Sequence, residues 1–171
     1  MALRHLLVPA TLVAALHPAA QAHGRGPSTP EERAHVVKLA ADADKDPLAA
    51  MAAEGRWFDK WLDEVPDIMF GGEAPARWCE GAAKGDLRRV LRFQYQLSGV
   101  AYQIEHQLLE PKTLEHKLAI HQAALEGVLC AYETLRSKGP ENRSEKMEEA
   151  LALRAKGELP AFVKSLFAAR H

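Results

Sequence analysis

The sequence predicts an all-α protein, and three observations support this prediction. From Pro30 onward the apolar residues recur at steps of three and four, which is the period of an amphipathic helix. Prolines and capping residues stand where helices would begin and end. No run of alternating β-branched residues bounded by turn signals indicates a strand. We therefore expect a single domain built as a bundle of five to six helices around a long antiparallel helical hairpin.

Individual helices follow from local signals. Ser28-Thr29-Pro30 offers a capping residue and a proline for the first turn, and Asp46-Pro47 repeats the pattern. Pro66 ends the helix that Pro47 begins, because proline cannot continue an α-helix. Gly139-Pro140 marks another break, after which Asn142 or Ser144 can cap a further helix. The longer predicted helices cover residues 30–42, 47–64, 85–109, 114–135 and 144–156, with short helices around residues 78–79 and over 160–169.

The two longest predicted helices form the hairpin. They are separated by the short break Glu110-Pro111-Lys112-Thr113, so they must run antiparallel. The second of them carries a heptad-like seam that alternates steps of four and three. Its members are Leu114, Leu118, His121, Leu125, Val128, Tyr132 and Leu135.

The first 22 residues have the features of an export signal. Arg4 supplies the positive start, residues 6–16 form a short apolar core, and Ala20-Gln21-Ala22 is a small-x-small cleavage site. A membrane anchor would need about 20 apolar residues, so this stretch is too short to span a bilayer. We expect cleavage before His23, a flexible lead over residues 23–29, one helical domain over 30–171, and a periplasmic or secreted protein without a stable membrane anchor.

Length and charge narrow the function classes. Removing 22 of 171 residues leaves 149, which suits one domain with one core. The 21 basic and 23 acidic residues that remain nearly balance, so nothing favours binding to nucleic acid or to an anionic membrane surface.

The two cysteines, Cys79 and Cys130, gain meaning from the predicted export. Oxidising compartments favour disulfides, and a single pair has only one connectivity. We expect a Cys79–Cys130 disulfide that links the short helix covalently to the middle of the hairpin. The alternative is two free thiols on different helices.

His106 and His116 form the one candidate metal site. An antiparallel hairpin that turns near Pro111 brings these two residues to the same end, next to Glu105 and Glu115. Imidazole and carboxylate groups on facing helices are typical ligands of transition metals in bundles, so a transition metal would be the cofactor. The alternative is that both histidines are solvated near a turn.

Aromatic and methionine side chains gather in the second half of the predicted helix 47–64 and in the loop that follows it. Trp57 and Trp61 lie one helical turn apart, and the apolar loop Ile68-Met69-Phe70 follows soon after. Side chains of these types are enriched at the centres of protein interfaces. We interpret the five residues as a partner-binding surface. Two alternatives stay open: the loop folds inward over the tryptophans, or the residues line a pocket for a small apolar ligand.

A polar stripe in the middle of the predicted hairpin suggests a second ligand surface. Tyr95, Tyr102, Gln103 and His106 fall on one helix face at helical spacing, where they could line a groove for a polar ligand or a peptide. The alternative is a tightly packed hairpin whose glutamines are bonded internally.

No catalytic motif, phosphate-binding glycine loop or haem attachment sequence is present, and no family resemblance is identified. The leading prediction is therefore a non-catalytic binding or accessory module that acts on another periplasmic protein. The first alternative is a periplasmic metal-binding protein that uses the histidines at the hairpin end. The second is an enzyme whose site no motif marks.

Overall fold

The computed structural model describes residues 25–169, and these residues form helices and loops without any strand. The predicted leader, residues 1–22, lies outside the described residues. None of the helices within 25–169 is both long and apolar enough to cross a bilayer. In chain order the elements are α1 (Pro30–Ala43), α2 (Pro47–Glu64), α3 (Ala74–Gly81), α4 (Gly85–Glu105), α5 (Leu114–Arg136), the 3-10 helix η1 (Pro140–Asn142), α6 (Glu145–Ala155) and α7 (Leu159–Ala168).

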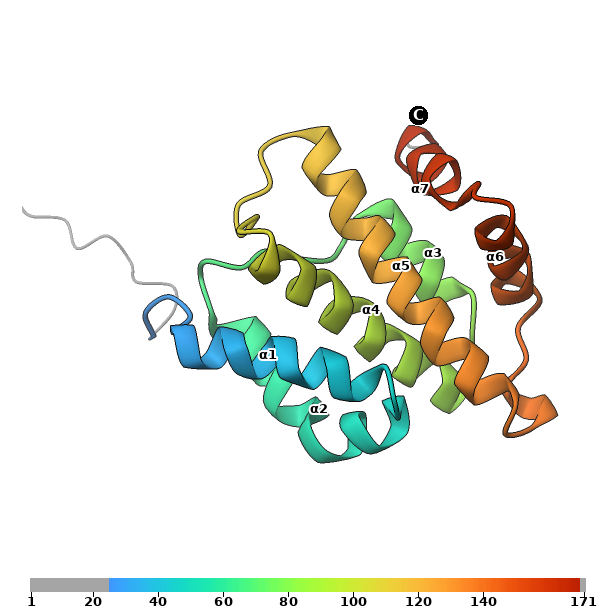
Figure 1. Ribbon diagram of the computed structural model, residues 1–171, viewed down its shortest axis with the longest axis horizontal. Helices are drawn as coiled ribbons and strands as arrows, with labels where there is room; N and C mark the ends of the chain where they lie inside the picture. The colour runs from blue at the N-terminus through green and yellow to red at the C-terminus, as the bar shows by residue number, and fades with distance from the viewer. Residues whose placement is uncertain (1–24, 170–171) are drawn as a thin grey trace, which may run out of the picture.

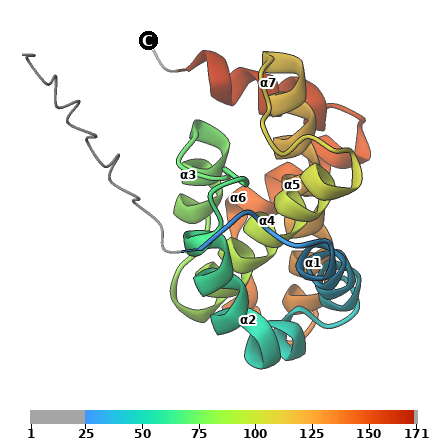
Figure 2. The ribbon, with the colours of Figure 1, turned by 90° about the vertical axis from the view of Figure 1, so that its left-hand side faces the viewer.

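Helix α4 is the centre of the fold because it contributes side chains to two separate hydrophobic clusters. Phe93, Leu97 and Val100 pack into a cluster with residues of α1 and α2. Leu87 and Leu91 pack into a second cluster with α3, α5, α6 and α7. Figures 1 and 2 show the resulting arrangement, with α1 and α2 on one side of α4 and the other helices on the other.

The all-α prediction is confirmed, but the helix count differs from it. The described residues hold seven α-helices instead of five to six, and the two short ones, α3 and α7, pack into the core through Cys79 and Val163 among others. Helices α4 and α5 lie side by side and run in opposite directions (Figure 1). Helix α4 ends at Glu105, so the segment that joins it to α5 is residues 106–113 and is longer than the predicted break.

Cap residues explain where the helices begin. Thr29 makes a full capping box with Glu32, and the Asp46 side chain accepts hydrogen bonds from the amides of Leu48 and Ala49. Ser144 caps α6 by accepting from the Met147 amide. These starts agree with the local signals in the sequence.

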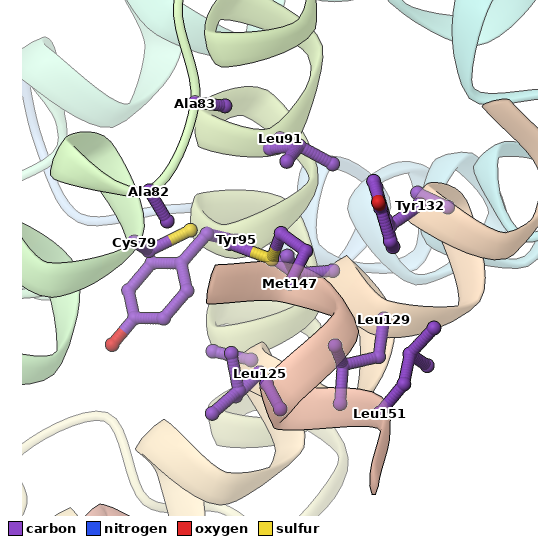
Figure 3. Packing of buried hydrophobic residues seen from close by; sticks show 14 of the residues in the cluster. Cys79, Ala82, Ala83, Leu91, Tyr95, Leu125, Leu129, Tyr132, Met147 and Leu151 are labelled. Carbon is purple, nitrogen blue, oxygen red and sulfur yellow. The ribbon is translucent and has the colours of Figure 1, made fainter. Parts of the chain in front are cut away.

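The predicted disulfide is wrong in this structure, since both cysteines are free. Cys79 is 1 % exposed and its sulfur lies among the core side chains near Tyr95 (Figure 3). Cys130 is exposed on α5, where Arg154 approaches its sulfur at 3.8 Å. Burial raises the pKa of the Cys79 thiol to about 12, so this thiol stays protonated and unreactive at neutral pH.

The end of the predicted flexible lead is attached to the body of the protein. Ser28 is 5 % exposed, and its amide and hydroxyl both donate to the Asp67 carboxylate, at 2.8 and 2.7 Å. Arg33 donates to the same carboxylate at 2.9 Å and to the Ser28 hydroxyl at 2.7 Å. These bonds join Ser28 and Arg33 to the loop that contains Asp67. The flexible lead over residues 23–29 stays a prediction.

Candidate functional site

A cavity of about 710 Å³ opens between the end of α2, the loop that follows it, α4, and the first half of α5 with its preceding segment. Its wall mixes apolar side chains with polar and charged ones, as is typical of ligand sites. The lining residues are Leu62, Asp63, Pro66, Asp67, Ile68, Met69, Phe70, Gly71, Glu73, Gln96, Gln103, Leu109, Glu110, Pro111, Lys112, Lys117, Ile120 and His121.

The loop from residue 65 to residue 73 forms the rim of the cavity, and two attachments hold it in place. At its start, Asp67 is bound by Ser28 and Arg33. Burial by itself would raise the pKa of Asp67, but the hydrogen bonds from Ser28 and Arg33 outweigh it and lower the pKa. The carboxylate therefore stays ionised and keeps the N-terminal segment joined to the rim.

The second attachment is the ring of Phe70. It stacks on His121 with ring centroids 5.1 Å apart and lies 5.4 Å from the Tyr95 ring. The ring also lies directly over Gly99, where a Cβ atom would overlap it. The absence of a side chain at position 99 therefore lets the loop approach α4 closely.

Two glutamines of α4 face this cavity. Gln103 is 1 % exposed, and its Nε2 donates to the Met69 carbonyl oxygen at 3.3 Å. This bond fixes the amide orientation, since only the NH₂ group can donate to a carbonyl. The Oε1 atoms of Gln103 and Gln96 are buried and have no hydrogen-bond partner among the described residues. Buried acceptors of this kind are costly unless a water or a ligand satisfies them.

A chain of hydrogen bonds reaches one wall of the cavity through His121, Glu73 and Lys117. The Tyr95 hydroxyl lies 2.5 Å from Nδ1 of His121, and Nε2 of His121 lies 2.8 Å from Oε2 of Glu73. Lys117 donates to the other Glu73 oxygen at 3.0 Å. The chain thus links α4, α5 and the residue that precedes α3.

The electrostatics of this chain define its protonation state. Burial raises the pKa of Tyr95, so its hydroxyl remains the donor to Nδ1. Burial also lowers the pKa of His121, although Glu73 opposes this effect. Burial alone would raise the pKa of Glu73, but Lys117 and His121 outweigh it and lower the pKa. These directions favour a neutral His121 beside an ionised Glu73, and we interpret the ring proton as lying on Nε2, from which it is donated to Glu73.

This protonation state limits what the network can do chemically. Both ring nitrogens of His121 are engaged, one by Tyr95 and one by Glu73. His121 itself is only 3 % exposed. The imidazole therefore orders the wall of the cavity, and the more exposed groups of this network are Lys117 and Glu73.

The five residues of the predicted partner-binding surface differ widely in their exposure to solvent. Trp61 and Ile68 are buried, at 2 % and 4 % exposed, and Trp57 is half-buried between His35 and Trp61. Phe70 is half-buried under the rim. Met69 alone of the five is fully available, at 78 % exposed. The loop therefore contributes one exposed apolar side chain and the cavity behind it.

The histidines of the predicted metal site do not gain further ligands. His106 is exposed, stacks on Tyr102 with centroids 3.8 Å apart and bonds to the Tyr102 carbonyl oxygen at 3.0 Å. His116 lies half-buried in the first turn of α5. Within residues 25–169 no three His, Cys, Asp or Glu side chains gather as a metal site. The metal site at His106 and His116 stays a prediction.

Sequence reasoning placed Tyr95 and Gln103 on a common polar face, and both lie at this site, but Glu73, Gln96 and Lys117 were missed. A partial signal existed in the four-residue spacing of Lys117 and His121, which puts both on one face of α5. No local sequence signal pointed to Glu73, because it lies in a loop 48 residues away from His121 in the chain.

Comparisons with protein-family models, with curated proteins and with solved structures found no match.

Proposed function

We propose that this chain is an exported, non-catalytic binding module, and that its cavity receives a segment of another periplasmic protein. The single observation that supports this best is the position of Met69, which is 78 % exposed at the rim of a cavity of about 710 Å³. Flexible methionine side chains adapt to varied partner surfaces, and apolar anchors around a pocket are typical of interface centres.

The composition of the cavity suits a peptide better than a purely apolar molecule. Leu62, Leu109 and Ile120 offer apolar contact, while Gln96 and Gln103 carry unpartnered carbonyl oxygens on side chains that line the cavity. A polypeptide segment brings both apolar side chains and amide donors. The Tyr95–His121–Glu73 chain holds one wall of this site in a fixed arrangement, which suits a preformed binding surface.

Replacing Met69 by glutamate should abolish capture of the partner without affecting folding, because the side chain is mostly in solvent. We would place a photo-crosslinking residue at position 69 and, as a matched control, at Leu48, an exposed apolar residue that does not line the cavity. Irradiation in the native periplasm should give adducts from position 69 only. Met69→Glu should prevent capture of that same adduct partner, and Leu48→Glu should not. Equal adducts from both positions, or none from position 69, would contradict the proposal.

Export is tested separately. Expressed with its natural start in a Gram-negative host, the protein should be recovered from the periplasmic fraction with His23 as its first residue, because the leader fits a cleavable signal. N-terminal sequencing and intact mass measure this directly. Replacing Ala20 and Ala22 by bulky leucines should leave the precursor uncleaved. Recovery of the natural chain from the cytoplasm with Met1 retained would contradict export.

A further inference from the structure

A second hollow, of about 390 Å³, lies between α2 and α4 and is lined by three arginines. Arg56 projects from α2, and Arg89 and Arg92 project from α4, and all three are exposed. Asp59 is the one acidic residue in the lining. We call this hollow the arginine groove.

The arginines are poorly neutralised. Arg89 lies 3.4 Å from Asp86, an exposed and weak ion pair. Within residues 25–169 neither Arg56 nor Arg92 has a carboxylate within 4 Å. Two planar donor groups thus remain available on the walls of one concave surface, and guanidinium groups match carboxylate geometry.

The arginine groove adjoins the cavity of the proposed function, because Gln96 lines both. Gln96 also lines a small hollow that Gly71 and Gly72 border. On α2, Asp59 lines the groove and Asp63, one turn later, lines the cavity. The two hollows are therefore neighbouring parts of one surface along α4.

The α4 side of the groove is a helix stripe that ends at Gln96. Arg89, Arg92 and Gln96 follow one another at steps of three and four, so they lie on one face, and beyond Gln96 the Phe70 ring covers that face at Gly99. At 1.5 Å per residue, Arg89 and Gln96 are about 10 Å apart along the axis. An extended chain of about three residues covers that length, at about 3.3 Å per residue.

We infer that the arginine groove is the anion subsite of an extended peptide site, and that the segment bound in the cavity carries an acidic residue which Arg56 and Arg92 bind. This inference rests on the proposed function for the nature of the occupant, a protein segment. The inference specifies the composition of the bound segment: apolar and amide groups at the end that enters the cavity, and carboxylates at the end that meets the arginines.

The test uses three capped hexapeptides as probes: four alanines followed by Asp-Glu, by Asn-Gln or by Lys-Lys. Titration into the mature chain is followed by NMR of the arginine Nε–H groups and by calorimetry at low ionic strength. We expect the acidic peptide to bind, to shift the Arg56 and Arg92 resonances, and to lose affinity as salt is added. The other two peptides should bind at least about tenfold more weakly, since charge-assisted hydrogen bonds are lost.

The double variant Arg56→Gln, Arg92→Gln should lose about tenfold or more in affinity for the acidic peptide. Its matched control is Arg143→Gln, Lys146→Gln, which removes two exposed charges near the start of α6. The NMR shifts in the unmodified chain give the same answer if the double variant folds poorly.

Three results would overturn the inference: equal binding of the acidic and amide peptides, equal loss in both double variants, or inorganic phosphate binding as tightly as the peptide. The last would show an adventitious ion site only. Binding of the acidic peptide at the arginines together with failure of the Met69 crosslinks would contradict the proposed occupant of the cavity while leaving the anion subsite intact. Met69 crosslinks without peptide binding would contradict the subsite alone.

Discussion

Replacing Phe58 by alanine is expected to lower the free energy of unfolding by about 3–5 kcal/mol. Phe58 is 0 % exposed on α2, and its ring meets Phe93 of α4 edge to face with centroids 5.9 Å apart. It also stacks near Trp61 at 6.1 Å. Removing the ring leaves a cavity where the layer of α1 and α2 meets α4, and urea denaturation followed by circular dichroism would measure the loss.

Two control variants show whether the loss of stability comes from the buried volume of Phe58. Phe58→Leu keeps most of the volume and should cost less than about 1.5 kcal/mol. Phe167→Ala removes a ring that is only half-buried on α7, and should also cost less than Phe58→Ala. A loss below about 1.5 kcal/mol for Phe58→Ala would show that the layer of α1 and α2 does not depend on this contact. Because α2 supplies one wall of both hollows, such a result would also weaken the structural basis of the proposed peptide site.

Local signals predicted the fold class well because helix starts depend on neighbouring residues. Thr29 with Glu32, and Asp46 with the amides that follow it, form their caps within three residues of sequence. The apolar period of the predicted seam marks the buried face of α5 from His121 to Leu135, whereas Leu114, the first predicted member, is 55 % exposed. Short helices are harder to count from sequence, because packing rather than local preference stabilises them.

The disulfide prediction failed for a reason that was partly visible in the sequence. Cys130 stands two residues from both Val128 and Tyr132, which places it on the opposite face of α5 from that buried seam. Cys79 instead faces the core. The predicted compartment and the number of cysteines favoured a bridge, but the position of Cys130 on the helix opposed it.

The candidate site could be predicted only in part because its contacts are long-range. Helical spacing places Tyr95 and Gln103 on α4, but nothing local brings Glu73 to His121 or Asp67 to Ser28. The same limit applies to the aromatic cluster. The half-buried Trp57 and buried Trp61 resemble interface residues in sequence, yet Trp57 packs edge to face against His35 of α1.

Acid is expected to destabilise the fold, beginning as the pH falls through about 6.5, and the variant His121→Gln should remove the first part of that loss. Burial lowers the pKa of His121 below its ordinary value of 6.5, so the unfolded chain binds a proton at a higher pH than the folded chain does. The free energy of unfolding therefore decreases as pH falls below that value.

Two carboxylates extend the effect to lower pH. The pKa of Glu73 is held below its ordinary value of 4.5 and that of Asp67 below 3.8. Each contributes stability that is present above its ordinary pKa and is lost as the pH falls through the lowered one. The histidine and the carboxylates thus act in the same direction but in successive ranges of pH.

Glutamine at position 121 tests the histidine contribution because it keeps the polar contacts without titrating. Its amide can accept from Tyr95 and donate to Glu73, so the fold should be retained at pH 7 with a loss of about 1–3 kcal/mol from imperfect geometry. Urea denaturation at pH 7, 6 and 5 should then show a flatter pH dependence than the natural chain. His106→Gln is the matched control, because that ring is exposed and its loss leaves the buried chain intact. If the natural chain and His121→Gln lose stability in parallel between pH 7 and 5, the imidazole is not buried in its neutral form, and the assignment of its proton to Nε2 is wrong.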